Sequence, residues 1–69
     1  MKISTRNALA GRIVELTRGA VMAKVVVETK GGERIASAIF VDSVDDLGLK
    51  IGDEVLAVVK STDVMIAKP

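Results

Sequence analysis

The sequence lacks two residue types on which much protein chemistry depends, since its 69 residues include no cysteine and no histidine. Disulfides and thiolate or imidazole zinc sites are therefore excluded. The same absences exclude thiol redox chemistry and catalysis of the Ser-His-Asp or Cys-His kind. The remaining chemistry must rely on carboxylates, hydroxyls, amides and cationic side chains.

Aromatic residues are also scarce, and the positive and negative charges nearly balance. Phe40 is the only aromatic residue, and ten Lys or Arg against nine Asp or Glu give a formal net charge of +1. The chain therefore has neither a base-stacking platform nor a general basic field for nucleic acid. No apolar run reaches the roughly 20 residues that span a membrane, and no secretory signal opens the chain. We expect a cytoplasmic protein with neither a nucleic-acid nor a membrane partner.

Apolar residues, by contrast, are in surplus: 49% of the chain is hydrophobic and the mean hydropathy is +0.42. We expect one domain, residues 1–69, and a domain of this size buries only about 60% of the surface that its unfolded chain exposes. Residues 20–28 and 34–41 carry apolar side chains on both alternating faces, although an exposed face is usually more polar. A homo-oligomer would cover this surface. The alternative is a monomer with scattered apolar surface residues.

The apolar residues are mainly β-branched, with eleven Val and six Ile, and this favours strands. Alternation and turn signals predict five strands, at residues 8–16, 20–28, 34–41, 54–59 and 64–67. Gly31-Gly32 predicts a tight hairpin. Ser43 is expected to cap a short helix over residues 43–47, which Gly48 would end. This order predicts an all-β fold, a small five-stranded OB-like barrel with one helix between strands 3 and 4.

Two segments gather hydrogen-bond donors beside a cation: Ser4-Thr5-Arg6-Asn7 before the first predicted strand, and Lys60-Ser61-Thr62 after the fourth. Hydroxyls, an amide and backbone N–H groups can all donate to a tetrahedral oxyanion, whose charge a guanidinium or ammonium offsets. Neither segment has enough donors alone, but together, within one subunit or across an interface, they could surround a small dianion. Ser43 and the adjacent helix amides are a third donor set. The alternative is ordinary turn residues with solvated charges.

The carboxylates and glycines give no sign of catalysis. Asp42, Asp45 and Asp46 cluster at the spacing of a helix cap and not of a metal-binding loop. The glycines match neither a dinucleotide fingerprint nor a P-loop. We therefore expect a protein that is not an enzyme and holds neither a catalytic cofactor nor a bare metal cation.

Three segments, taken together, resemble the motifs of a known family. Residues 4–11 resemble the Ser-Ala-Arg-Asn-x-Leu-x-Gly opening of the molbindins, the Mop family of molybdate-binding proteins, with Thr5 in place of the usual Ala. Residues 43–52 are similar to the family's Ser-x-x-x-Leu-x-Leu-x-x-Gly segment, and residues 60–64 to its Lys-Ala/Ser-Ser/Thr-x-Val ending. The resemblance covers nearly the whole chain, in order.

The resemblance implies a Mop or TOBE-type domain that assembles as a homohexamer, a trimer of dimers. Its function would be reversible binding and intracellular storage of molybdate or tungstate at subunit interfaces. At the matching positions the ligands would be Ser4, Thr5 through its backbone N–H, Arg6, Lys60 and Ser61, with Ser43 a weaker candidate.

Two other functions remain as alternatives. One is an OB-type nucleic-acid-binding module, which only the expected fold supports. The other is a purely structural or regulatory assembly domain, related to the C-terminal domains of transporter ATPases.

Overall fold

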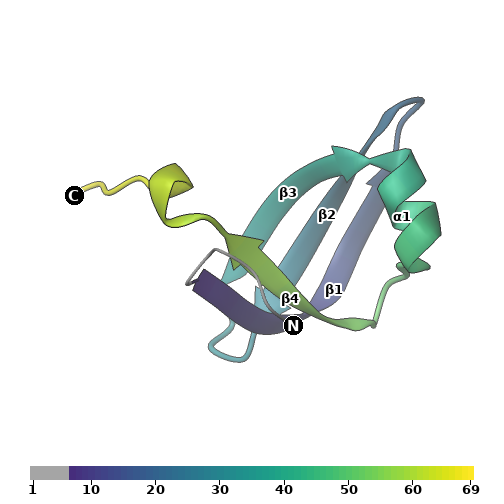
Figure 1. Cartoon of the computed structure of the whole chain (residues 1–69). Coiled ribbons are helices and arrows are strands. Elements are labelled where there is room, and N and C mark those ends of the chain that lie inside the picture. The colour runs from purple at the N-terminus through teal and green to yellow at the C-terminus, as the bar shows by residue number, and fades with distance from the viewer. Residues whose placement is uncertain (1–6) are drawn as a thin grey trace.

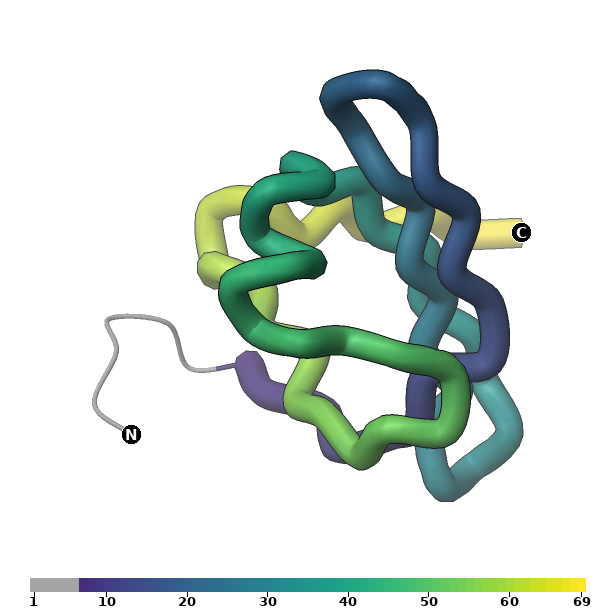
Figure 2. Tube along the Cα trace, turned by 90° about the vertical axis from the view of Figure 1, so that its right-hand side faces the viewer, coloured from purple at the N-terminus to yellow at the C-terminus, as the bar shows by residue number. Residues whose placement is uncertain are grey.

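A computed structural model of the chain describes residues 7–69. The elements are β1 (Asn7–Arg18), β2 (Met22–Thr29), β3 (Arg34–Phe40), α1 (Val41–Leu47), β4 (Glu54–Val59) and the 3-10 helix η1 (Ser61–Asp63). The strands form one antiparallel sheet in the order β3-β2-β1-β4. The sheet is strongly curled, with α1 at one end and η1 beyond the other (Figures 1 and 2). The predicted all-β, OB-like class is thereby confirmed, with four strands in residues 7–69.

The curl depends on β1, which pairs with two neighbours along its length. Its first half pairs with β4, its second half pairs with β2, and Gly11 and Arg12 pair with both. A Cβ atom on Gly11 would lie 2.5 Å from the Glu28 carbonyl oxygen, so only glycine fits where the strands approach. The register then shifts between Ile13 and Glu15, and such a bulge bends a strand and increases its twist.

The core lies inside the curl and under α1. Its buried side chains are Ile13, Ala23, Val25, Val27 and Val44, with Leu16, Ile39, Val41, Leu49 and Val55 packed around them. Val44, 1% exposed, fixes α1 against the sheet. Gly48 ends the helix with φ at 63°, and its N–H donates to carbonyl groups of the last turn, as predicted for this glycine.

The predicted start of the helix is wrong. The helix begins at Val41 with Phe40 as its N-cap, and no side chain caps it, so Ser43 is its third residue. The Val41 N–H donates to the Val21 carbonyl at 2.8 Å, which attaches the first helical residue to the β1–β2 turn. This contact between distant parts of the chain outweighs the local capping preference of Ser43.

The predicted fifth strand is not formed within the described chain. Residues 64–67 have no regular secondary structure, and the chain runs away from the sheet after η1 (Figure 1). Met65 and Ile66 are 92% and 90% exposed, so the tail packs against little of its own chain. The surplus apolar surface expected from composition therefore lies partly in this tail. Separately, no helix within residues 7–69 is long and apolar enough to cross a membrane.

Candidate functional site

Asn7 of the first donor segment and the start of the second segment lie at one end of the β1/β4 ladder. Asn7, the first residue of β1, pairs with Val59, the last residue of β4. Arg6 directly precedes Asn7 in the sequence, and Lys60 directly follows Val59. The antiparallel pairing therefore joins Asn7 of the first donor segment to the base of the second. The predicted ligands Ser4, Thr5 and Arg6 lie outside the described residues.

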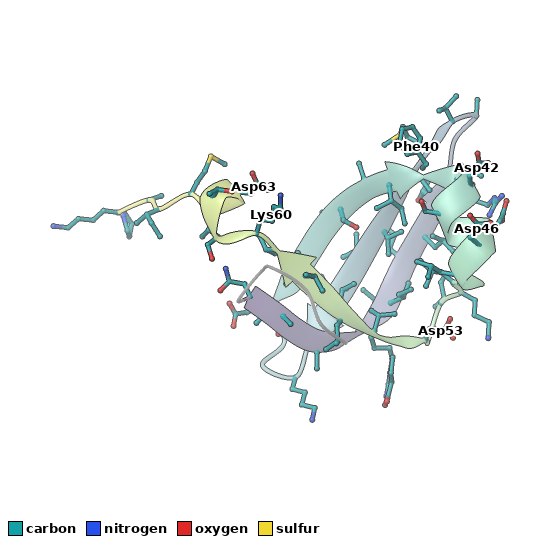
Figure 3. The ribbon with its side chains drawn as sticks, viewed as in Figure 1. Phe40, Asp42, Asp46, Asp53, Lys60 and Asp63 are labelled. Carbon is teal, nitrogen blue, oxygen red and sulfur yellow. The ribbon has the colours of Figure 1, made fainter. Side chains whose placement is uncertain are left out.

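Lys60 and Ser61 belong to one tight turn. Lys60 is the N-cap of η1, and the Asp63 N–H donates to the Lys60 carbonyl at 2.9 Å. Both predicted ligands are exposed, as is the Thr62 side chain. The four ion pairs found within residues 7–69 do not include Lys60. An ammonium group and two hydroxyls of this turn are thus open to a ligand, and Figure 3 shows Lys60 with Asp63 on the same turn.

A cavity of about 500 Å³ adjoins this end of the sheet. It is lined by Asn7, Ala8, Leu9, Ile35, Val59 and Val64. Within this lining only Asn7 has a polar side chain, so the cavity walls alone cannot satisfy a dianion. An oxyanion here would need the donors of the Lys60 turn and further donors from other parts of the molecule.

Ser43 is not brought to this site within one chain. It lies half-buried in α1, which contacts β2 and β3. Figure 1 places α1 and η1 at opposite ends of the sheet. Ser43 can therefore join Lys60 and Ser61 only if another copy of the chain supplies it.

Asp45, one of the acidic residues of α1, forms an ion pair that the sequence did not reveal. Arg18 donates from Nη1 and Nη2 to the two carboxylate oxygens of Asp45 at 2.9 and 3.2 Å. These hydrogen bonds, with the guanidinium charge, lower the pKa of Asp45 from its ordinary value of 3.8. Within residues 7–69, no three His, Cys, Asp or Glu side chains are grouped so that they could hold a metal ion.

A second, open cavity of about 610 Å³ lies over the outer side of the sheet and includes Arg12, Glu28 and Glu54 in its lining. Arg12 is the cross-strand partner of both glutamates. Glu28 also pairs with Arg34, whose Nε lies 3.1 Å from its Oε2. Charges thus alternate across all four strands. This balance of charges makes the second cavity a poorer anion site than the Lys60 turn. The alternation of charge could have been found only from the strand register.

Comparison with known proteins identifies relatives that match nearly the whole chain. The TOBE domain model matches residues 3–66. Molybdenum-pterin-binding protein 2 of Clostridium pasteurianum is 58% identical over 66 residues, which cover 96% of this chain and 97% of that protein. The similarity therefore includes both donor segments and the sheet between them.

Two solved structures share the fold. A molybdate-binding protein from Sporomusa ovata superposes with a TM-score of 0.93 at 47% identity, covering 99% of this chain and all of that one. The cytoplasmic molybdate-binding protein ModG, in a form with molybdate bound, gives a TM-score of 0.95 at 36% identity. This chain, matched over its full length, spans 49% of ModG.

Proposed function

This chain belongs to the TOBE-domain family, within its small molybdenum-pterin-binding (Mop) group, and we propose that it binds molybdate or tungstate reversibly as an intact oxyanion. The observation that carries the proposal is the pairing of Asn7 with Val59. It joins Asn7, the last residue of the first donor segment, to the strand that leads directly into the second, more than fifty residues later in the sequence. The similarity to molybdate-binding proteins supports the choice of anion.

The proposed ligands act as hydrogen-bond donors and charges. Arg6 and Lys60 offset the two negative charges, while hydroxyl groups and the Thr5 backbone N–H fix the oxygen positions. Each hydrogen bond to a charged group contributes about 1.5–3 kcal/mol. The full ligand set is Ser4, Thr5, Arg6, Lys60 and Ser61, with Ser43 in a lesser role.

We propose that the complete site forms between subunits of a homohexamer, a trimer of dimers. The described part of one chain offers few donors around the cavity, and Ser43 lies at the other end of the sheet. The exposed apolar residues Leu9, Leu56 and Val58 give the chain surface to bury against other copies.

The biological role we propose is storage and buffering of the oxyanion in the cytoplasm, performed by residues 1–69 as one domain. The protein is a binder and not an enzyme, because the anion enters and leaves without any covalent change. The description of ModG as cytoplasmic supports the location. Discrimination against sulfate, another tetrahedral dianion, would depend mainly on the size of the enclosed site.

Isothermal titration with molybdate, tungstate, sulfate and phosphate tests this function. We expect saturable binding of molybdate or tungstate, at least tenfold tighter than binding of sulfate or phosphate. Failure of both metal oxyanions to bind, or equal binding of all four anions, would contradict the proposal. Native mass spectrometry of the same samples reports the number of subunits and of bound anions.

A further inference from the structure

The β1–β2 connection, residues 18–21, holds α1 at two points that lie one helical turn apart. At the start of the helix, the Val41 N–H donates to the Val21 carbonyl at 2.8 Å. Farther along, Arg18 donates from Nη1 and Nη2 to the two carboxylate oxygens of Asp45 at 2.9 and 3.2 Å. Residues four apart in a helix lie on the same face. The β1–β2 connection therefore holds one face of α1, through Val41 and Asp45.

The connection is tightly closed, whereas the helix depends on it. The Gly19 N–H donates to the Met22 carbonyl at 2.8 Å, and a Cβ atom on Gly19 would lie 2.8 Å from the same oxygen. By contrast, α1 has only seven residues and no side-chain cap, and a helix this short is not stable by itself. Its orientation must therefore come from tertiary contacts, namely the β1–β2 connection and the burial of Val44 in the core.

Ser43 lies between the two attachment points, on the opposite side of the helix. Successive residues of an α-helix are about 100° apart around its axis, so Ser43 is roughly 160° from both Val41 and Asp45. It is half-buried, and its hydroxyl has no hydrogen-bond partner among residues 7–69. The attachment of α1 thus leaves this hydroxyl on the side away from the β1–β2 connection, where another copy of the chain can use it.

We propose that the Arg18–Asp45 ion pair positions Ser43 for the oxyanion bound at the Lys60 turn of another copy. This inference rests on the proposed function, in which Ser43 is a secondary ligand. Arg18 does not touch the anion in this arrangement: it is a positioning residue, which fixes the angle at which α1 presents the Ser43 hydroxyl. A bidentate pair fixes orientation as well as distance. Because hydrogen bonds weaken steeply with misalignment, a small rotation of α1 would lower the affinity.

The exposure of the ion pair separates positioning from folding. The Arg18 and Asp45 side chains are 48% and 59% exposed, and an ion pair so exposed contributes only modestly to stability. Its removal should therefore leave the protein folded and change mainly the orientation of α1.

A double-mutant cycle, measured by isothermal titration with molybdate, tests the inference. The variants are Arg18→Ala, Ser43→Ala and the two combined. We expect Arg18→Ala to weaken binding about two- to fourfold, and no more than Ser43→Ala does, because it acts through Ser43 alone. In the Ser43→Ala background the same substitution should change the affinity by less than about 1.5-fold, since the hydroxyl that it positions is gone.

Arg34→Ala is the matched control. Arg34 is also an exposed arginine in an ion pair, with Glu28 at 3.1 Å, but it begins β3 and its pair does not involve α1. This substitution should leave the affinity within about 1.5-fold in both backgrounds. Exchanging the charges, with Arg18→Asp and Asp45→Arg in one chain, restores an ion pair and should recover binding to within about 1.5-fold of wild type.

Nuclear magnetic resonance of the protein without molybdate checks the effect on the helix. Backbone amide signals of residues 41–47 should shift in Arg18→Ala and stay in place in Arg34→Ala. Unchanged helix signals in Arg18→Ala would overturn the inference, because the ion pair would then not set the orientation of α1.

Three titration results would also overturn it: equal losses for Arg18→Ala in the two backgrounds, an unchanged affinity for Arg18→Ala, or a charge exchange that does not recover binding. Each of these requires a wild type that binds molybdate, so each leaves the proposed function standing. A wild type that binds no molybdate would disprove the proposed function, and this inference with it.

Discussion

Asn7 lies directly opposite Val59 at the end of the β1/β4 ladder. This relationship places Asn7, the last residue of one sequence motif, beside the strand that leads into the other motif. The first donor segment ends at Asn7, and the second begins one residue after Val59. A site for a small dianion needs several donors from different directions, and a ladder end supplies two chain segments at once. The sheet thereby acts as the scaffold of the proposed site.

Gly11→Ala should destabilise the fold because the new methyl group would meet the Glu28 carbonyl oxygen at 2.5 Å. Backbone atoms in a paired strand cannot move away easily, so we expect a loss of about 1–3 kcal/mol. Thermal unfolding should show a midpoint lower by about 5–20 °C for a domain of this size. Gly31→Ala is the control, since its nearest non-neighbouring atom would be 3.5 Å away. Equal midpoints for the two variants would show that the close approach at Gly11 does not destabilise the Gly11→Ala protein.

Asp45→Asn should remove a pH-dependent part of the stability. The hydrogen bonds from Arg18 lower the pKa of Asp45, so the unfolded chain binds its proton more readily than the folded chain does. The stabilisation is therefore complete above the ordinary value of 3.8 and is lost as pH falls through the lowered pKa. Thermal midpoints of wild type and variant should differ near neutral pH and converge in strong acid. Asp46→Asn is the control, and a similar, pH-independent difference for both variants would refute this role of the ion pair.

Ser43→Ala should weaken molybdate binding by less than about fivefold, because Ser43, on α1, is proposed only as a secondary ligand. Titration calorimetry measures this effect, with Ser61→Ala as the comparison. Ser61→Ala removes a proposed principal ligand and should weaken binding by about tenfold or more. A larger loss of molybdate affinity for Ser43→Ala than for Ser61→Ala would show that Ser43 is the more important ligand of the two.

Thr5→Ala should leave molybdate binding within about twofold of wild type, since the proposed contribution of Thr5 is its backbone N–H. Thr5→Pro removes that N–H and should weaken binding clearly. Circular dichroism of both variants controls for folding. If Thr5→Ala alone abolished binding, the hydroxyl group would be the ligand, contrary to the proposal.

The features predicted correctly from the sequence depend on local signals. Gly32, with φ at 88°, forms the predicted hairpin turn, and Gly48 ends the helix. The features that local signals could not predict depend on distant contacts. Val41 begins the helix because it bonds to Val21, and the pairing of Gly11 with both β2 and β4 is invisible in strand alternation.

Sequence reasoning could describe the candidate site only in part. The donor types of the Lys60 turn could be read from the sequence, because hydroxyls and cations indicate anion binding wherever they gather. Their proximity to Asn7 required the strand register. The tail at residues 64–67 has the pattern of a strand, yet it forms none in the described structure, because alternation alone does not determine which strand a segment pairs with.

The central claim is that Lys60 binds molybdate at the ladder end. Isothermal titration of wild type, Lys60→Ala and Lys30→Ala with molybdate tests it most directly, with native mass spectrometry to confirm that the assembly is unchanged. Lys30 is the matched control because it is an exposed lysine in the hairpin between β2 and β3. We predict that Lys60→Ala weakens binding by about 10- to 100-fold, the loss of one charged hydrogen bond, and that Lys30→Ala leaves it unchanged. Equal affinities for all three proteins would contradict the claim.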